Sequence, residues 1–101
     1  MGGLGLAPGV NMSDTLAFFE ATHGTAPNIA GKDLANPGSL LLCGALMLEH
    51  MGWQEAGHKV RAALDAVLAS RRVTVDIVQE MPGATQVGCR EFGELSLAAM
   101  V

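Results

Sequence analysis

The apolar run Leu40–Leu48 places the strongest constraint on how this 101-residue chain folds. Asn36 and Pro37 precede it as a helix N-cap and a first helical residue, where the missing N–H of proline costs nothing. The apolar side chains are spread around most of the helix surface, so the sequence predicts a helix that is buried on nearly all sides and ends at Gly52. Two short strands and three other helices are too few to bury such a helix, so we expect the chain to be part of a larger fold.

Three further helical segments are predicted after this run. Gln54 to Ser70 has apolar residues at three- and four-residue spacing, which indicates an amphipathic helix, and Arg71-Arg72 follows at the negative end of its dipole. Thr74 is a cap candidate for a short helical turn over Val75 to Met81. The last segment, Glu91 to Met100, carries Phe92, Leu95 and Met100 on one side and is expected to close the fold.

The first third of the chain is irregular and rich in glycine and proline. Within it we expect two short strands joined by loops, near Gly3–Ala7 and Leu16–Ala21. The second holds Phe18-Phe19, which suits a largely buried strand. The predicted fold class is therefore α/β, with two short strands followed by about four helices.

Composition excludes several classes of function. Half of the residues are hydrophobic, 16% are charged and the net charge is −4, so the chain is neither disordered nor suited to bind nucleic acid. Leu40–Leu48 is too short to cross a membrane, and Met1–Gly5 lacks the features of a signal peptide. Cys43 and Cys89 are expected to be reduced thiols, Cys43 as a small core residue, in a cytoplasmic protein.

The glycine-rich segments do not match phosphate-binding motifs. Gly24–Lys32 ends in Gly-Lys like a P-loop, but it has Ala26 where that motif needs glycine and Asp33 where it needs Ser or Thr. Gly3–Gly9 has the wrong glycine spacing for a dinucleotide fingerprint, and Pro8 stands where the helix would begin. Neither motif is present.

Catalytic and metal-binding patterns are also missing. The histidines, including His50 and His58, have no Cys or carboxylate at the four-residue offset that puts two ligands on one helix face, so we expect surface histidines and no metal site. No serine sits in a nucleophile elbow, and no Cys–His arrangement can be argued. What remains is the loop Thr22–Lys32, which follows a strand and leads to a capped helix. Its backbone groups are suited to contact the edge of a planar heterocycle, and His23 to stack on its face.

This loop resembles the adenine-binding loop of the isocitrate and isopropylmalate dehydrogenase family. Thr25, within His-Gly-Thr-Ala-Pro, is typical of the isocitrate branch, whereas the isopropylmalate branch usually has serine there. The resemblance covers nearly the whole chain, and the segments that carry it are Gly2–Gly9, Glu20–Pro27, Ile29–Lys32, Ala35–Pro37, Met47–Trp53 and Gly88–Gly93.

The resemblance implies that residues 1–101 form the C-terminal part of the cofactor-binding large domain, without the small domain and the N-terminal half of the large domain. It implies that Asn36 contacts adenine, that His23 packs rather than transfers protons, and that Glu20 lies towards the nicotinamide. The adenosine pocket would be lined by His23, Gly24, Thr25, Ala26, Pro27, Asn28 and Ile29.

The cofactor follows from four positions. NADP-dependent bacterial members of the family hold the 2′-phosphate with Lys-Tyr after the Ala-Pro of the loop and with Tyr and Arg on the later short helix. Here those positions are Asn28, Ile29, Val75 and Gln79, so the resemblance favours NAD, with NADP possible. NAD-dependent relatives usually carry Asp at position 28, which repels a phosphate; Asn28 repels nothing, so discrimination against NADP is expected to be weak.

The implied activity is the oxidative decarboxylation of isocitrate to 2-oxoglutarate in the tricarboxylic acid cycle, by a homodimer that uses Mg²⁺ or Mn²⁺. The family's substrate arginines and serine, its proton-transferring Tyr and Lys, and its metal aspartates do not map onto this chain, which has no tyrosine. We therefore expect no catalytic residue and no metal ligand within the 101 residues, which should be inactive in isolation. The alternatives are a fragment of 3-isopropylmalate or homoisocitrate dehydrogenase, or a non-catalytic remnant that acts as an interaction piece.

Overall fold

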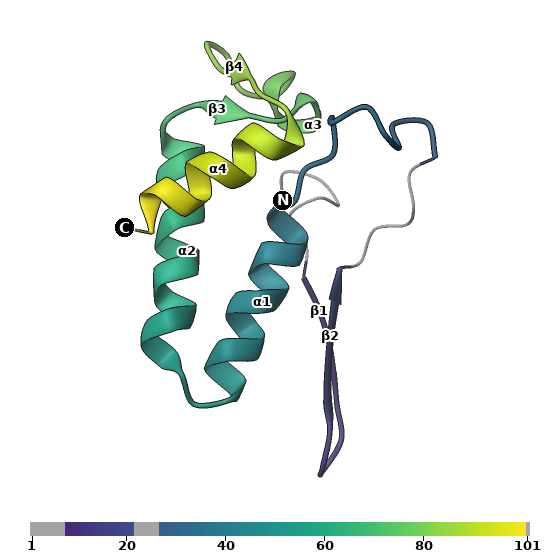
Figure 1. Cartoon of the computed structure of the whole chain (residues 1–101), viewed down its shortest axis with the longest axis vertical. Coiled ribbons are helices and arrows are strands. Elements are labelled where there is room, and N and C mark those ends of the chain that lie inside the picture. Colours follow the sequence, from purple (N-terminus) through teal and green to yellow (C-terminus); the bar gives the residue numbers. More distant parts are fainter. Residues whose placement is uncertain (1–7, 22–26, 101) are drawn as a thin grey trace.

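A computed structural model of the chain describes residues 8–21 and 27–100. Figure 1 shows a β-hairpin beside a pair of antiparallel helices, with the last helix crossing the second of the pair. This is a mixed α/β arrangement, as the sequence predicts. The elements in chain order are β1 (Pro8–Met12), β2 (Ala17–Ala21), α1 (Gly38–His50), α2 (Gln54–Ala69), β3 (Arg72–Val73), α3 (Val75–Val78), β4 (Thr85–Gln86) and α4 (Cys89–Ala99).

β1 and β2 form an antiparallel hairpin in which Pro8 pairs with Ala21 and Met12 with Ala17. The hydroxyl of Ser13 accepts the Leu16 N–H at 3.0 Å and so closes the turn. The predicted strand is confirmed as β2 apart from its first residue. The expectation that it is largely buried is wrong within this chain, because Phe18 is 60% exposed and no residue of β2 is fully buried. The strand predicted at Gly3–Ala7 lies outside the described residues, and β1 was missed because Pro-Gly normally indicates a turn; at the first position of a strand, proline removes no internal ladder bond.

α1 begins one residue later than predicted. Pro37 occupies the N-cap rather than the first helical position, and the side-chain oxygen of Asn36 accepts the Gly38 N–H at 2.8 Å. Gly52, with a φ of +89°, follows the end of the helix as expected. The expectation that α1 is buried on nearly all sides is wrong within this chain, because Leu40 is 62% exposed and Met47 is 41% exposed. Among the described elements, the hairpin and α2 are the main neighbours of the helix.

α1 and α2 approach closely at Gly57, which is buried. A Cβ at this position would lie 2.5 Å from Cγ of Glu49 and 2.9 Å from the carbonyl oxygen of Ala45. Beside this contact the guanidinium of Arg61 donates to both carboxylate oxygens of Glu49, at 2.7 and 3.1 Å. The two helices are thus joined by close backbone packing and a two-point ion pair.

The hydrophobic core lies where α2 meets α4 and the segment before α4. Leu64, Val67, Val87 and Phe92 form a buried cluster, and Phe92 has no exposed surface. α4 begins two residues before its predicted start, and Phe92 and Leu95 face inward as predicted, Leu95 being partly buried against this cluster. Packing in this cluster holds the C-terminal half of the chain together.

Two short parallel strands were not predicted. β3 and β4 have two residues each, and Arg72 lies in β3 rather than in a helix C-terminus. Arg71 follows the C-cap residue of α2 and has a φ of +63°, and its guanidinium donates to the Pro82 carbonyl at 2.5 Å. α3 ends at Val78, three residues before its predicted end at Met81. Over the described ranges, the helices are all too short or too polar to cross a membrane.

Candidate functional site

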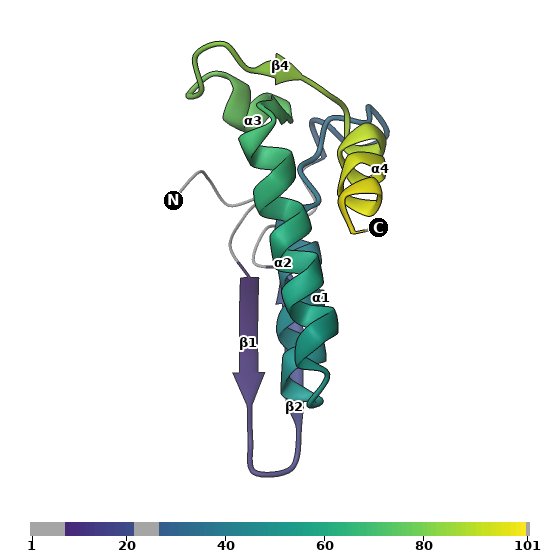
Figure 2. The same ribbon diagram turned by 90° about the vertical axis from the view of Figure 1, so that its left-hand side faces the viewer.

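The segment 27–37 links the hairpin to α1 and carries most of the described residues of the predicted adenosine site. In Figure 2 this segment, drawn in blue, runs between α3 and α4. It contains a tight turn in which the Lys32 N–H donates to the Ile29 carbonyl at 3.1 Å, with Gly31 at a φ of +76°. Glycine adopts this left-handed conformation without the steric cost that a Cβ brings.

Asn36 ties the end of this segment to α3. Its side-chain oxygen caps α1, and its side-chain nitrogen donates to Oδ2 of Asp76 at 3.1 Å across 40 residues of sequence. Asn36 is 8% exposed. Because both ends of its amide are used and its side chain is buried, the residue that the resemblance assigns to the adenine has a fixed position.

The other oxygen of Asp76 is also used. Oδ1 accepts the Thr74 hydroxyl at 2.5 Å, and the carbonyl of Thr74 accepts the N–H groups of Ile77 and Val78 at 3.0 and 3.1 Å. Thr74 is fully buried and occupies the N-cap of α3, as the sequence predicts. The carboxylate of Asp76 therefore links Asn36 to the N-cap residue of α3.

A second tie joins the middle of the segment to α4. The backbone carbonyl of Asp33 accepts the Cys89 N–H at 3.0 Å, and its Oδ1 accepts the Arg90 N–H at 2.8 Å. Gly88 is the N-cap residue of α4 and has no side chain with which to cap the helix. The first N–H groups of α4 thus find their acceptors on the segment 27–37.

The structure places the predicted site residues unevenly. His23, Gly24, Thr25 and Ala26 lie outside the described residues. Pro27, Asn28 and Gln79 are exposed, and Ile29 and Val75 are half-buried. Asn36 and Val75 are brought together through Asp76, whereas none of the hydrogen bonds among the described residues joins Asn28 or Ile29 to α3.

Two residues that position the site were not singled out from the sequence. The sequence marks Asp33 only as a mismatch to a P-loop and gives no signal for Asp76. Their partners lie 57 and 40 residues away, so no local pattern reveals them. The one available signal is that Asp33 has a φ of +57°, a conformation that Asp, Asn and Gly adopt more readily than other residues.

The charged side chains on α3 and directly after it are acidic, whereas the Arg71 guanidinium reaches the Pro82 carbonyl just beyond them. Asp76 lies within the helix and Glu80 follows it, and no Lys or Arg occurs between positions 73 and 89. Ile29 and Val75 supply half-buried apolar surface of the kind on which a heterocycle packs.

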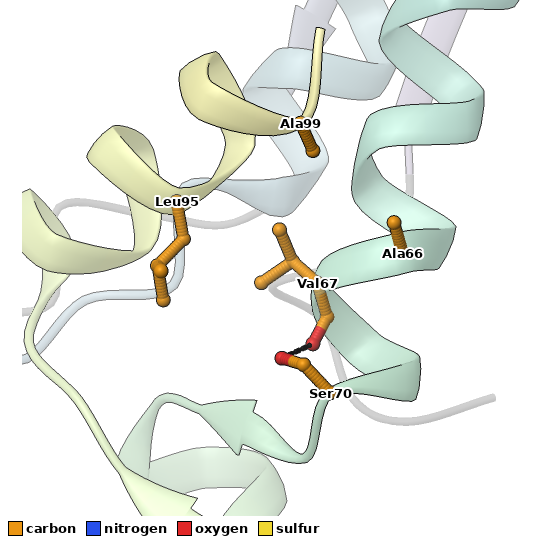
Figure 3. A pocket seen from close by; sticks show the side chains of 5 residues that line it. All are labelled: Ala66, Val67, Ser70, Leu95 and Ala99. Carbon is orange, nitrogen blue, oxygen red and sulfur yellow. Dashed lines mark hydrogen bonds between the residues drawn. The ribbon is translucent and has the colours of Figure 1, made fainter.

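A described pocket of about 160 Å³ lies elsewhere, in the groove between α2 and α4 (Figure 3). Its hydroxyl, on Ser70, already donates to the Val67 carbonyl at 2.6 Å. Sites for drug-sized ligands enclose about 300 Å³ or more, so this apolar groove is too small to hold a dinucleotide. Its lining residues are Ala66, Val67, Ser70, Leu95 and Ala99.

The same described ranges carry titratable and potentially metal-ligating side chains. They contain no group of three or more His, Cys, Asp or Glu side chains that could hold a metal ion. Cys43 and Cys89 are free thiols, and Cys43 is buried with its Sγ donating to the Glu20 carbonyl at 3.0 Å. The Arg61 guanidinium, which donates to Glu49, holds the pKa of that carboxyl below its usual value, far from the segment 27–37 along α1.

Comparison with known proteins decides the family. Residues 1–95 match the family model described as isocitrate/isopropylmalate dehydrogenase. The chain belongs to this family. It is 50% identical over 100 residues to "Isocitrate dehydrogenase [NADP]" of Pseudomonas aeruginosa and 47% identical over 100 residues to the protein of the same name from Helicobacter pylori. These matches cover 99% of the chain and 24% of each relative, so the chain spans about a quarter of their length.

The structural comparison agrees with this assignment. The crystal structure of isocitrate dehydrogenase from Methylococcus capsulatus matches 98% of this chain and 28% of that one, with a TM-score of 0.89 and 37% sequence identity. The fold is thus a fragment of the isocitrate/isopropylmalate dehydrogenase fold. Its two hairpin strands and four helices confirm the predicted fold class, to which the structure adds β3 and β4.

Proposed function

We propose that the chain is part of an isocitrate dehydrogenase that oxidises and decarboxylates isocitrate to 2-oxoglutarate, and that it supplies the adenosine half of the dinucleotide site. The observation that carries this proposal is the double attachment of the segment 27–37, through Asn36 to α3 and through Asp33 to α4. Attachment at two points gives a loop the fixed geometry that ligand binding requires. The identity to two relatives named isocitrate dehydrogenase supports the choice of substrate.

In this proposal the chain is the C-terminal part of the large domain and has no catalytic group of its own. The groups that bind isocitrate, transfer protons and hold Mg²⁺ or Mn²⁺ belong to the rest of the protein and to a partner subunit of a homodimer. The 101 residues alone are therefore expected to be inactive. The two free thiols suit a reducing compartment such as the cytoplasm.

For the cofactor we propose NAD in preference to NADP. The names of both relatives point to NADP, so this choice rests on residues of this chain alone. The positions that the resemblance assigns to the 2′-phosphate are Asn28, Ile29, Val75 and Gln79, and none is cationic. Asp76 and Glu80 add negative charge beside two of them. Because Asn28 carries no charge, NADP should be used less efficiently rather than excluded.

The test is a steady-state assay of the full-length protein that contains this chain, with isocitrate and Mg²⁺ and with NAD or NADP varied. We expect isocitrate-dependent reduction of the dinucleotide, release of CO₂, and a higher kcat/KM for NAD than for NADP. Oxidation of 3-isopropylmalate but not of isocitrate would overturn the substrate assignment. A higher kcat/KM for NADP would overturn the cofactor assignment and leave the substrate assignment standing.

A further inference from the structure

The N-terminus of α4 lacks a cap of its own. Its N-cap residue is Gly88, and no side-chain cap bond forms there. The acceptors for the Cys89 and Arg90 N–H groups are instead the carbonyl and carboxylate of Asp33, 57 residues before Arg90. A negative charge at this end of the 11-residue helix also complements the helix dipole.

Gly88 is needed for space rather than for its backbone conformation. Its φ of −84° and ψ of 176° are ordinary for any residue. A Cβ on Gly88, however, would lie 2.8 Å from the carbonyl oxygen of Asp33 and would also collide with its carboxylate. The close approach of Asp33 to Gly88 is therefore a specific fit between the segment 27–37 and α4.

The two attachments have different consequences for the segment. Asn36 fixes the end that enters α1. Asp33 is the tie nearest to the turn Ile29–Lys32, and through this turn it is the nearest anchor of Asn28 and Ile29. If the Asp33 carboxylate is lost, Asn36 still bonds to Asp76 on α3, but the side-chain bond between Asp33 and the Arg90 N–H of α4 is gone.

We propose that Asp33 is a positioning residue for the dinucleotide. By capping α4 it anchors the segment that carries Asn28 and Ile29 to that helix, and thereby sets the affinity for the adenosine half of the cofactor without touching it. This inference deepens the proposed function and rests on it.

The backbone at Asp33 dictates which substitutions are informative. Its φ of +57° disfavours alanine, which would add backbone strain to the loss of the side chain. Asp33→Gly keeps the backbone conformation and removes the carboxylate. Asp33→Asn keeps both the conformation and one acceptor oxygen for the Arg90 N–H, and so serves as the conservative variant.

The test compares these variants in the full-length protein, with KM for NAD, KM for isocitrate and kcat measured separately. Asp33→Gly should raise KM for NAD by about tenfold while kcat and KM for isocitrate stay within about twofold, because the lost contact acts on cofactor binding alone. Asp33→Asn should restore KM for NAD to within about threefold of the parent value. The matched control is Glu49→Gln, which breaks the ion pair between α1 and α2 and should leave KM for NAD within about twofold.

Three results would overturn the inference: an unchanged KM for NAD in Asp33→Gly, an equal rise in Glu49→Gln, or an Asp33→Asn variant as impaired as Asp33→Gly. If the parent protein does not oxidise isocitrate, the proposed function itself fails and the inference falls with it. A parent that is active beside an Asp33→Gly variant with unchanged kinetics refutes only the role of Asp33.

Discussion

Replacing Asn36 by aspartate separates its two structural roles. The substitution keeps an oxygen that can accept the Gly38 N–H, so the cap of α1 is retained. It removes the N–H that Asn36 donates to Asp76 at 3.1 Å and sets two carboxylates against each other. Asn36→Asp therefore tests the link between the segment 27–37 and α3 and keeps the cap at the start of α1.

The cost can be worked from the geometry. Losing a hydrogen bond to a charged group costs about 1.5–3 kcal/mol. Two like charges about 4 Å apart repel by about 1 kcal/mol in a water-like environment, which is the lower limit here because Asp76 is exposed but Asn36 is buried. The sum predicts a loss of about 3 kcal/mol in the free energy of unfolding of the large domain at pH 7.

Urea unfolding of the full-length protein at pH 7 and at pH 4 measures this cost, with Asn36→Ala as the matched variant that carries no new charge. At the lower pH, protonation of one of the facing carboxyl groups removes the repulsion. The difference between Asn36→Asp and Asn36→Ala should therefore shift in favour of Asn36→Asp by about 1 kcal/mol. A stability of Asn36→Asp within about 0.5 kcal/mol of the parent at pH 7 would refute the bond to Asp76 as a structural link.

Three further predictions concern α1, α2 and the cofactor. Gly57→Ala should lower the free energy of unfolding, measured by urea titration, by about 1–3 kcal/mol, because the new Cβ would collide with α1. The control is Gly44→Ala, whose Cβ would have nothing within 4 Å and which should be neutral or stabilising in the same titration. Arg61 lowers the pKa of Glu49 in the folded state. The ion pair therefore stabilises the fold fully at pH values above the ordinary pKa of about 4.5, and this stabilisation is lost as the pH falls through the lowered pKa. The Tm of Glu49→Gln should accordingly lie below that of the parent at pH 7 and converge with it as the pH falls through the lowered pKa, and a gap independent of pH would contradict the assignment. Gln79→Arg should raise kcat/KM for NADP relative to NAD by about tenfold, since a guanidinium at the end of α3 supplies a cationic partner for the 2′-phosphate. An unchanged ratio would count against the placement of the 2′-phosphate beside position 79.

The sequence predicts the helical half of the fold well and the hairpin only in part. Gln54–Ser70 has a clear three- and four-residue period, so α2 was placed to within one residue. Pro8-Gly9 hid β1, because the same dipeptide normally marks a turn. β3 and β4, with two residues each, are too short to show any period.

The candidate site was only partly predictable, for a different reason. Asn36 and the segment that leads to it stand out through their motif, whereas the contacts that fix them depend on residues far along the chain. The approach of Asp33 to Gly88 and the bond from Asn36 to Asp76 exist only once α3 and α4 have folded back onto the segment. Tertiary contacts of this kind leave no periodic signal in a single sequence.

The account's central claim is that this chain supplies the adenosine half of the site and sets the choice of cofactor. The most direct test replaces the matching quarter of the Pseudomonas aeruginosa isocitrate dehydrogenase [NADP] by this chain, which is 50% identical to it over 100 residues, and measures kcat/KM for both dinucleotides. The account predicts a folded chimera that oxidises isocitrate and whose ratio of kcat/KM for NAD over NADP exceeds that of its parent by about tenfold or more. A folded chimera that does not oxidise isocitrate, or that keeps the parent's ratio, would contradict it.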